Sequence, residues 1–206
     1  MSDNLRGSLF MVLAMAGFAL EDMLLKRVAG HGMPVGQILI LFGGGGSLLF
    51  MALTAEEKGL QGATFYAANP LVPLAKTAAV LNIEMLSPDG PARDIASWGK
   101  GRVSLENDLK RVAEAHGRTY SPDPNLEAGF FYRADHFAFA RAGVPAITVG
   151  AGLDRIDGGV ASGKALRDAY FARCYHQPCD AWTASWDARG QAQDVALLYA
   201  LGREIA

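Results

Sequence analysis

Two adjacent carboxylates, Glu56 and Glu57, follow an apolar run at residues 47–53 that has the composition of a buried strand. Functional side chains commonly lie where a strand opens into a loop. Neighbouring residues that leave a strand point in different directions, so one carboxylate can bind a metal ion while the other accepts a proton from water. Metal-dependent hydrolases divide the two roles in this way. For an isolated pair the alternative is a solvated acidic turn, because charged side chains gather on surfaces.

Further acidic and imidazole side chains occur at the ends of apolar segments or in the loops after them. They are Glu84, Asp135, His136, His176 and Asp180, with Tyr175 next to the last histidine. An open α/β sheet collects its binding site at such positions. Carboxylate and imidazole groups together suit zinc, and a catalytic zinc keeps one position open for water. Each element is weak evidence alone, since a single histidine near a proline more often serves a structural hydrogen bond.

Five short motifs follow one another along the chain after residue 53. They are Thr-Ala-Glu-Glu-Lys-Gly-Leu at 54–60, Asn-Ile-Glu-Met at 82–85, Tyr-Arg-Ala-Asp-His-Phe at 132–137, Gly-Val-Pro-Ala at 143–146 and Tyr-His-Gln-Pro at 175–178. In this order they resemble the catalytic domain of the two-zinc aminopeptidases of clan MH, the Zn-dependent exopeptidases. The resemblance covers residues 47–206 and implies the C-terminal part of a three-layer α/β/α domain.

The resemblance implies a role for each matching residue. Glu56 is expected to be the general base that activates a metal-bound water, while Glu57 and His176 are expected to bind one zinc. Tyr175 is expected to donate its hydroxyl to the oxyanion of the tetrahedral intermediate. Glu84 stands where the family has an aspartate on the other zinc, and its additional methylene displaces the carboxylate. The residues of the third motif that are expected to support the site without binding zinc are Arg133, Asp135 and His136.

Part of the family's ligand set has no counterpart in this chain. The family supplies a histidine and a bridging aspartate from a segment that precedes the Thr-Ala-Glu-Glu strand. The acidic and imidazole side chains upstream of residue 47 match no His-x-Asp pattern; they are Asp3, Glu21, Asp22 and His31. Because metal affinity depends on every donor, we expect no zinc, or one weakly bound zinc, and impaired hydrolysis of peptide substrates.

Residues 1–46 differ in character from the rest of the chain. Residues 7–20 are apolar all round, and residues 33–53 carry no charged side chain. The second run is about as long as the roughly 20 residues that a membrane-spanning helix needs. We therefore expect one or two transmembrane helices, contact with the lipid bilayer through residues 8–53 and association with a membrane, although peptidase relatives are usually secreted or periplasmic. A pair of buried helices in a soluble core is the alternative.

The same front segment resembles the start of a drug/metabolite transporter. The resemblance covers residues 1–50, from the first helix to the start of the second. Such transporters have many more helices, so no transport function is expected here. A join between a transporter-like front and a peptidase-like rear, near residues 47–53, accounts for both resemblances.

Length and composition fit one ordinary domain with an appended segment. The chain has 206 residues, half of them hydrophobic, and a formal net charge of -2. This balance gives no reason to expect a nucleic-acid partner. Cys174 and Cys179 are the only cysteines, too few for a disulfide framework, and the sequence leaves open one local bridge or two free thiols.

The region after residue 58 alternates strand-like and helix-like segments. Strands are expected at residues 76–85 and 144–149, and helices at residues 59–69, 105–116, 137–142 and 187–205. Ser104 is expected to cap the second of these helices and Gly117 to end it. The segment at residues 88–101 is interpreted as a polar loop.

Three hypotheses about function follow. The first is a zinc aminopeptidase domain whose front has been replaced, with impaired catalysis. The second is a membrane-anchored binding module without catalytic activity. The third is a fusion fragment that does not fold stably, because lost strands leave apolar sheet edges uncovered.

Overall fold

The structure is a computed structural model that describes residues 54–86 and 88–205. Its helices are α3 (Gln61–Ala68), α4 (Leu105–Ala115), α5 (His136–Arg141), α6 (Gly159–Arg173) and α7 (Arg189–Ile205). Its strands are β1 (Val80–Ile83), β2 (Asp94–Ser97), β3 (Thr119–Ser121) and β4 (Ala146–Ala151). Short 3-10 turns lie between them: η1 (Glu56–Lys58), η2 (Leu74–Lys76), η3 (Leu126–Ala128) and η4 (Phe130–Tyr132).

The predicted membrane helices and the transporter-like segment fall on residues 1–53, which lie outside this description. Among the residues that are described, no helix is both long enough and apolar enough to cross a bilayer. Bilayer contact through residues 8–53 and the division of the chain near residue 46 therefore stay predictions.

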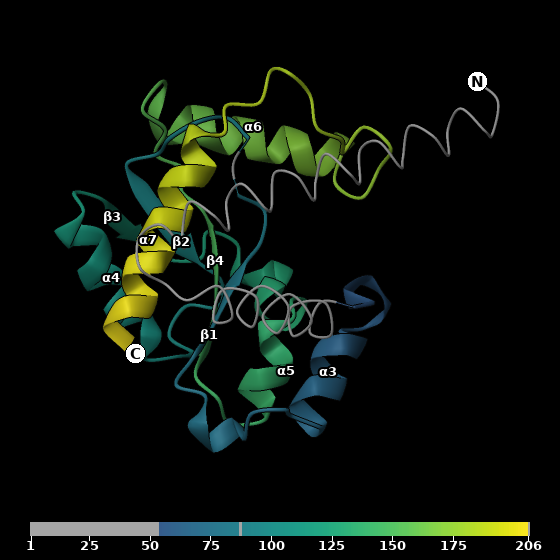
Figure 1. Cartoon of the computed structure of the whole chain (residues 1–206). Helices are drawn as coiled ribbons and strands as arrows, with labels where there is room; N and C mark the ends of the chain where they lie inside the picture. The colour runs from purple at the N-terminus through teal and green to yellow at the C-terminus, as the bar shows by residue number, and fades with distance from the viewer. Residues whose placement is uncertain (1–53, 87, 206) are drawn as a thin grey trace, which may run out of the picture. The chain divides into compact units, whose positions relative to one another are not determined.

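The described strands form one mixed sheet in the order β1-β4-β2-β3 (Figure 1). β1 runs parallel to β4, with Val80 opposite Ala146, and β2 runs parallel to β3. β2 and β4 are antiparallel, with Ala96 opposite Gly150. The carboxyl ends of β1 and β4 and the amino end of β2 therefore lie at the same end of the strands.

Helices cover both faces of this sheet, and β4 contributes side chains to both. On one face, Ile147 and Val149 pack with Ile95 of β2 against α4 and α7. On the other face, Ala146 packs with Phe139 of α5 and with α3. Figure 1 shows the sheet between these two pairs of helices. The predicted α/β class is confirmed for the described residues.

Helix α4 shows how the sequence pattern produces one of these layers. Its buried stripe consists of Leu105, Leu109, Val112 and Ala113. This spacing places the four side chains on one helical face. Gly117 follows the helix with φ +72°, a conformation that glycine adopts at little cost, as predicted. The predicted cap is wrong, because the Ser104 side chain makes no capping hydrogen bond. The Glu106 carboxylate accepts hydrogen bonds from the N–H groups of Gly101 and Arg102, in the loop before the helix.

Three strands and one helix differ from the sequence prediction, and one of these strands, β3, was not expected at all. The strand expected at residues 76–85 is shortened to β1, which is half-buried rather than buried on both faces because it lies at the edge of the described sheet. The segment interpreted as a polar loop contains β2, in which all residues are buried. No sequence pattern indicates α6, since its apolar side chains form no stripe and Gly163 is its buried residue.

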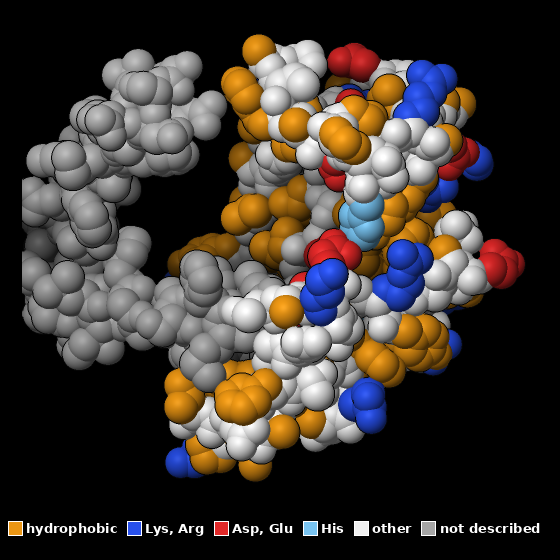
Figure 2. Space-filling view, turned by 90° about the vertical axis from the view of Figure 1, so that its right-hand side faces the viewer, with side chains coloured by type: hydrophobic (Ala, Val, Ile, Leu, Met, Phe, Trp, Pro, Cys, Tyr) orange, Lys and Arg blue, Asp and Glu red, His pale blue; other side chains and the backbone are white. Residues whose placement is uncertain are grey.

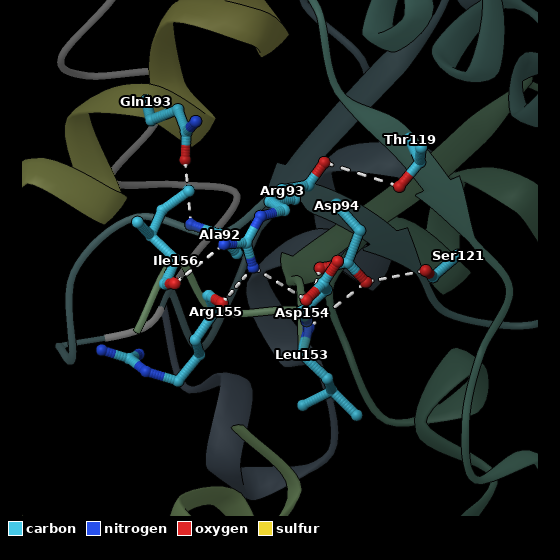
Figure 3. Close-up of polar contacts among 10 residues, drawn as sticks. All are labelled: Ala92, Arg93, Asp94, Thr119, Ser121, Leu153, Asp154, Arg155, Ile156 and Gln193. Carbon is cyan, nitrogen blue, oxygen red and sulfur yellow. Dashed lines mark hydrogen bonds and ion pairs between the residues drawn. The ribbon is translucent and has the colours of Figure 1, made fainter. Parts of the chain in front are cut away.

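Asp94 attaches the start of β2 to the segment that follows β4 (Figure 3). Its buried carboxylate accepts hydrogen bonds from Ser121 Oγ at 2.7 Å and from the N–H groups of Asp154 at 2.7 Å and Leu153 at 3.3 Å. The neighbouring Arg93 donates to the Asp154 carboxylate at 3.2 Å. A buried charge is tolerated only when it is hydrogen-bonded in this way, which explains how a charged residue begins an internal strand.

Helix α7 lies so close to the loop before β2 that only glycine fits at one contact. A Cβ atom added at Gly190 would lie 2.2 Å from the carbonyl oxygen of Gly90. At Gly202, in the same helix, the nearest atom would be Leu81 Cδ1 at 3.6 Å, which is an ordinary contact. The two glycines therefore differ in the space that surrounds them.

Replacing Gly190 with Ala should destabilise the fold by about 1–3 kcal/mol, because either α7 or the backbone at Gly90 has to shift. Gly202→Ala is the matched control in the same helix and should be neutral or stabilise by about 0.5–1 kcal/mol. Urea unfolding of both variants measures the free energies. Equal effects of the two substitutions would contradict the close approach of α7 to residue 90.

Candidate active site

Most of the predicted site residues line one cavity of about 690 Å³. It lies at the carboxyl end of β1, where η1, the segment before α5 and the segment after α6 meet. The predicted residues that line it are Glu56, Glu57, Glu84, Arg133, Asp135, Tyr175, His176 and Asp180. His136 is fully buried and lies outside the lining. On the face shown in Figure 2, a histidine side chain lies beside acidic and basic side chains.

Strained backbone is concentrated at this cavity. The described non-glycine residues with positive φ, between 51° and 59°, are Ala55, Leu60, Met85 and His176. Three of them line the cavity, and Ala55 directly precedes Glu56. Such conformations cost on the order of 1–3 kcal/mol each and persist where the surrounding structure holds them, often at functional sites. The clustering makes this cavity the candidate functional region.

A tight turn presents Glu56 and Glu57 to the cavity. Both residues lie in η1, which is bounded by left-handed residues Ala55 and Gly59. The N–H group of Gly62 in α3 donates to the carbonyl of Thr54 at 2.8 Å and ties the turn to that helix. Glu56 is half-buried and Glu57 is exposed, so the two adjacent carboxylates occupy different environments.

Glu57 and His176 are in contact although they come from distant parts of the sequence. The Nε2 atom of His176 lies 3.0 Å from Oε1 of Glu57. The Tyr175 ring stacks on the His176 ring, with centroids 3.9 Å apart and an interplanar angle of 21°. The fold thus brings the two residues expected on one zinc together with the expected oxyanion donor.

A chain of hydrogen bonds connects Glu84 with the buried His136. Asn82 Nδ2 donates to Oε1 of Glu84 at 3.0 Å and to Oγ1 of Thr148 at 3.1 Å. Thr148 Oγ1 in turn lies 2.6 Å from Nδ1 of His136. His136 is therefore connected with Glu84 through β4 and β1, and its supporting role stays a prediction. The sequence did not indicate Thr148, because it lies inside an apolar strand where a hydroxyl is inconspicuous.

Burial raises the pKa values of three carboxyl groups in the cavity, those of Glu84, Asp135 and Glu56. The pKa of Glu84 rises to about 7, mainly by burial, while the hydrogen bond from Asn82 acts in the opposite direction. The pKa of Asp135 rises to about 6 through burial and then through the charge of Glu56. Burial and the charge of Glu57 also raise the pKa of Glu56. A cation in the cavity would oppose these shifts, because it favours the charged carboxylates.

Asp135 carries a polar atom that needs a partner. Within the described structure, its buried Oδ1 atom has no hydrogen-bond partner, an arrangement that is uncommon in folded proteins. The same residues contain no group of three or more His, Cys, Asp or Glu side chains placed to hold a metal ion. Among the described residues, the cavity therefore offers a cluster of carboxyl groups and the Glu57–His176 pair as candidate donors.

Besides these acids, the cavity is lined by two side chains that can donate hydrogen bonds, Tyr175 and Arg133. Burial raises the pKa of Tyr175, and the charge of Arg133 acts in the opposite direction. The Arg133 guanidinium lies over the Phe130 ring, 5.2 Å from its centroid. Tyr170 of α6 also lines the cavity and donates to Asp180 at 2.7 Å. Tyr170 was missed at the sequence level because no pattern indicates its helix.

The comparison with protein families agrees with this geometry. Residues 45–200 match the sequence pattern of peptidase family M28. They include every residue that lines the cavity. The chain belongs to peptidase family M28. The predicted peptidase family is therefore confirmed, whereas the resemblance of residues 1–50 to a transporter stays a prediction.

Aminopeptidases are among the proteins that this M28 chain resembles. Aminopeptidase Y of Saccharomyces cerevisiae is 31% identical over 141 residues, which are 65% of this chain and 24% of the relative. A solved aminopeptidase from Aneurinibacillus sp. strain AM-1 has 23% sequence identity and a TM-score of 0.45, over 71% of this chain and 30% of that one. The chain therefore spans less than a third of the length of either protein.

Replacing His136 with Asn should remove a pH dependence of stability. Burial lowers the pKa of His136 from 6.5 to about 4. The folded state thus favours the neutral ring. This contribution to stability is complete at a pH above 6.5, the pKa in the unfolded chain, and is lost as the pH falls toward about 4, the pKa in the folded protein. Its full size is about 3 kcal/mol. Asn retains a polar side chain and does not titrate.

Urea unfolding of the parent and of His136→Asn at about pH 4.5 and 7 measures this contribution. The raised pKa values of Glu84 and Asp135 change stability in the opposite direction with pH, but they are common to both proteins. The stability difference between parent and variant should be larger at the higher pH. A difference that does not change with pH would contradict a buried neutral histidine.

Proposed function

We propose that this chain carries the carboxyl-terminal part of the catalytic unit of a metal-dependent aminopeptidase, which removes residues from the amino ends of peptides. The main support is the convergence of Glu56, Glu57, Tyr175 and His176 in one cavity, with Glu57 and His176 3.0 Å apart. Membership of family M28 and the 31% sequence identity to aminopeptidase Y over 141 residues support the same class of reaction.

Glu56 is the general base in this proposal. Its raised pKa, caused by burial and by Glu57, lies closer to the neutral range in which a base transfers protons most effectively. Glu56 takes a proton from the attacking water molecule and passes it to the amine that leaves when the peptide C–N bond breaks. Its half-buried position leaves the carboxylate accessible from the cavity.

Tyr175 and Arg133 stabilise the negative charge that develops on the carbonyl oxygen. The Tyr175 hydroxyl is the donor, held in orientation by the stack on His176. The Arg133 charge acts on both Tyr175 and Glu56. Loss of a preorganised donor of this kind costs on the order of 10²-fold in rate.

The residues fit a zinc ion in part. Glu57 and His176 would hold one ion, and Glu84 would be a donor to a second; bound zinc would supply Lewis acidity and make a water molecule more acidic. Because the described residues contain no group of three such donors, the proposal includes weak binding of at most one zinc and impaired hydrolysis.

A binding module without catalytic activity is the second candidate, favoured by the same incomplete donor group. The cavity carries five carboxylates, those of Glu56, Glu57, Glu84, Asp135 and Asp180, and Arg133 is its cation among the described residues. Although Glu84 is partly protonated near pH 7, the remaining carboxylates outnumber the one guanidinium, and this negative charge suits the ammonium group at the amino end of a peptide. Such a module would bind peptides without cleaving them.

Replacing Glu56 with Gln should lower the hydrolysis of an aminoacyl anilide, with zinc added, by roughly 10²–10⁴-fold, because the amide cannot accept the proton. The exposed Glu114 of α4 provides the matched control Glu114→Gln, which should leave the rate unchanged. Anilide release followed by absorbance measures both. Equal rates for the parent and Glu56→Gln would remove Glu56 from the mechanism.

Replacing His176 with Ala should abolish the weak zinc binding, because only Glu57 would remain of the pair. His116, at the end of α4 and outside the cavity, gives the control His116→Ala, which should retain the affinity of the parent. Calorimetric titration with zinc measures stoichiometry and affinity, with at most about one ion expected for the parent. Two tightly bound ions would show that the donor set is complete.

A further inference from the structure

The loop that carries Tyr175 and His176 is closed by a disulfide bridge between Cys174 and Cys179. The structure thus selects the local bridge over two free thiols. Cys174 directly follows α6, and Cys179 is exposed. Four residues separate the two cysteines, so the bridge encloses little more than the two site residues.

The backbone of this loop is attached mainly to α6 and to itself. The N–H groups of Cys174 and Tyr175 both donate to the carbonyl of Tyr170, at 2.8 and 3.1 Å. Within the loop, the N–H group of Gln177 donates to the carbonyl of Cys174 at 2.8 Å. His176 has φ +59°, a left-handed conformation that a residue with a Cβ atom adopts only when it is held there.

The contacts of His176 with the rest of the site are too exposed to hold that conformation alone. The side chains of His176 and Glu57 are 47% and 67% exposed, and exposed ion pairs contribute little to stability. Tyr175, which stacks on His176, is half-buried against Phe171 of α6, with ring centroids 4.9 Å apart. Noncovalent contacts fix the base of the loop, whereas the position of His176 at its tip depends on the disulfide that closes the loop.

We propose that the Cys174–Cys179 bridge is a positioning element that holds His176 against Glu57 and Tyr175 in its stacked orientation, and that a dithiol reductant can release it. In that reaction the S–S bond breaks and two thiols form, while the dithiol supplies two electrons and two protons and becomes a disulfide. The exposed Cys179 sulfur gives the reductant access. The effect on metal binding rests on the proposed function, whereas the effect on the loop does not.

Hydrogen–deuterium exchange on the metal-free full chain tests the positioning directly. After treatment of the folded protein with dithiothreitol, the amides at residues 174–180 should exchange at least ~10-fold faster, as expected for local opening. Exchange in α4 and β4 should stay unchanged, because the cross-link spans too short a loop to control the whole fold. Unchanged exchange at residues 174–180 would overturn the proposal.

Zinc titration of the oxidised and reduced protein tests the consequence for the site. Reduction should weaken zinc binding by roughly 10–100-fold, the usual effect of losing a group that orients a ligand. Both proteins are titrated after removal of dithiothreitol, because its thiolates bind zinc themselves; the double variant Cys174→Ser with Cys179→Ser should match the reduced protein, whether or not it has been treated with dithiothreitol. Faster loop exchange with unaltered zinc affinity would also overturn the proposal.

The two proposals fail in different ways. If neither redox state binds zinc, the metal-dependent function fails, and faster exchange at residues 174–180 on reduction still supports the positioning role of the bridge. If zinc binds equally well in both states, the bridge has no role at the site, whatever the activity.

Discussion

The burial of β4 between two layers of helices is the constraint on which the site depends. Ile147 and Val149 belong to the core with α4 and α7, whereas the intervening Thr148 points to His136 of α5. A shift of β4 by one residue would exchange these faces, so its register is strongly determined. β1 is paired with β4 in parallel, and this pairing delivers Glu84 to the cavity with Asn82 beside Thr148.

This packed core supports a cavity whose strained backbone and buried polar groups cost free energy of folding. Left-handed backbone at Ala55, Met85 and His176 adjoins the acidic residues, and the buried Asp135 has an oxygen without a partner in the described structure. Proteins are only marginally stable, so such features have to be offset by interactions elsewhere. The core between the sheet, α4 and α7 contributes most of the fully buried apolar side chains that can offset them. A bound cation would relieve the electrostatic part of the cost.

The fold could be predicted from the sequence where one physical effect dominated. The stripe of α4 and its end at Gly117 were predictable, because helix periodicity and glycine conformation act locally. β2 could not be predicted, because Asp94 is acceptable in a buried strand only through hydrogen bonds from Ser121 and from the segment after β4. Likewise, the side-chain cap expected of Ser104 is not formed, and Glu106 in the first turn accepts hydrogen bonds from the loop before the helix, a contact that depends on the fold of that loop.

The sequence by itself determined the peptidase family and the chemical types at the site, since the acids, Tyr175 and His176 occur in short local motifs. The absence of a counterpart to the family's His-x-Asp segment stays a prediction from the resemblance. Only the tertiary structure decided that Glu57 meets His176, that Asn82 and Thr148 link Glu84 to His136, and that the two cysteines are joined. Contacts between distant residues depend on strand register and helix packing, which local motifs do not encode.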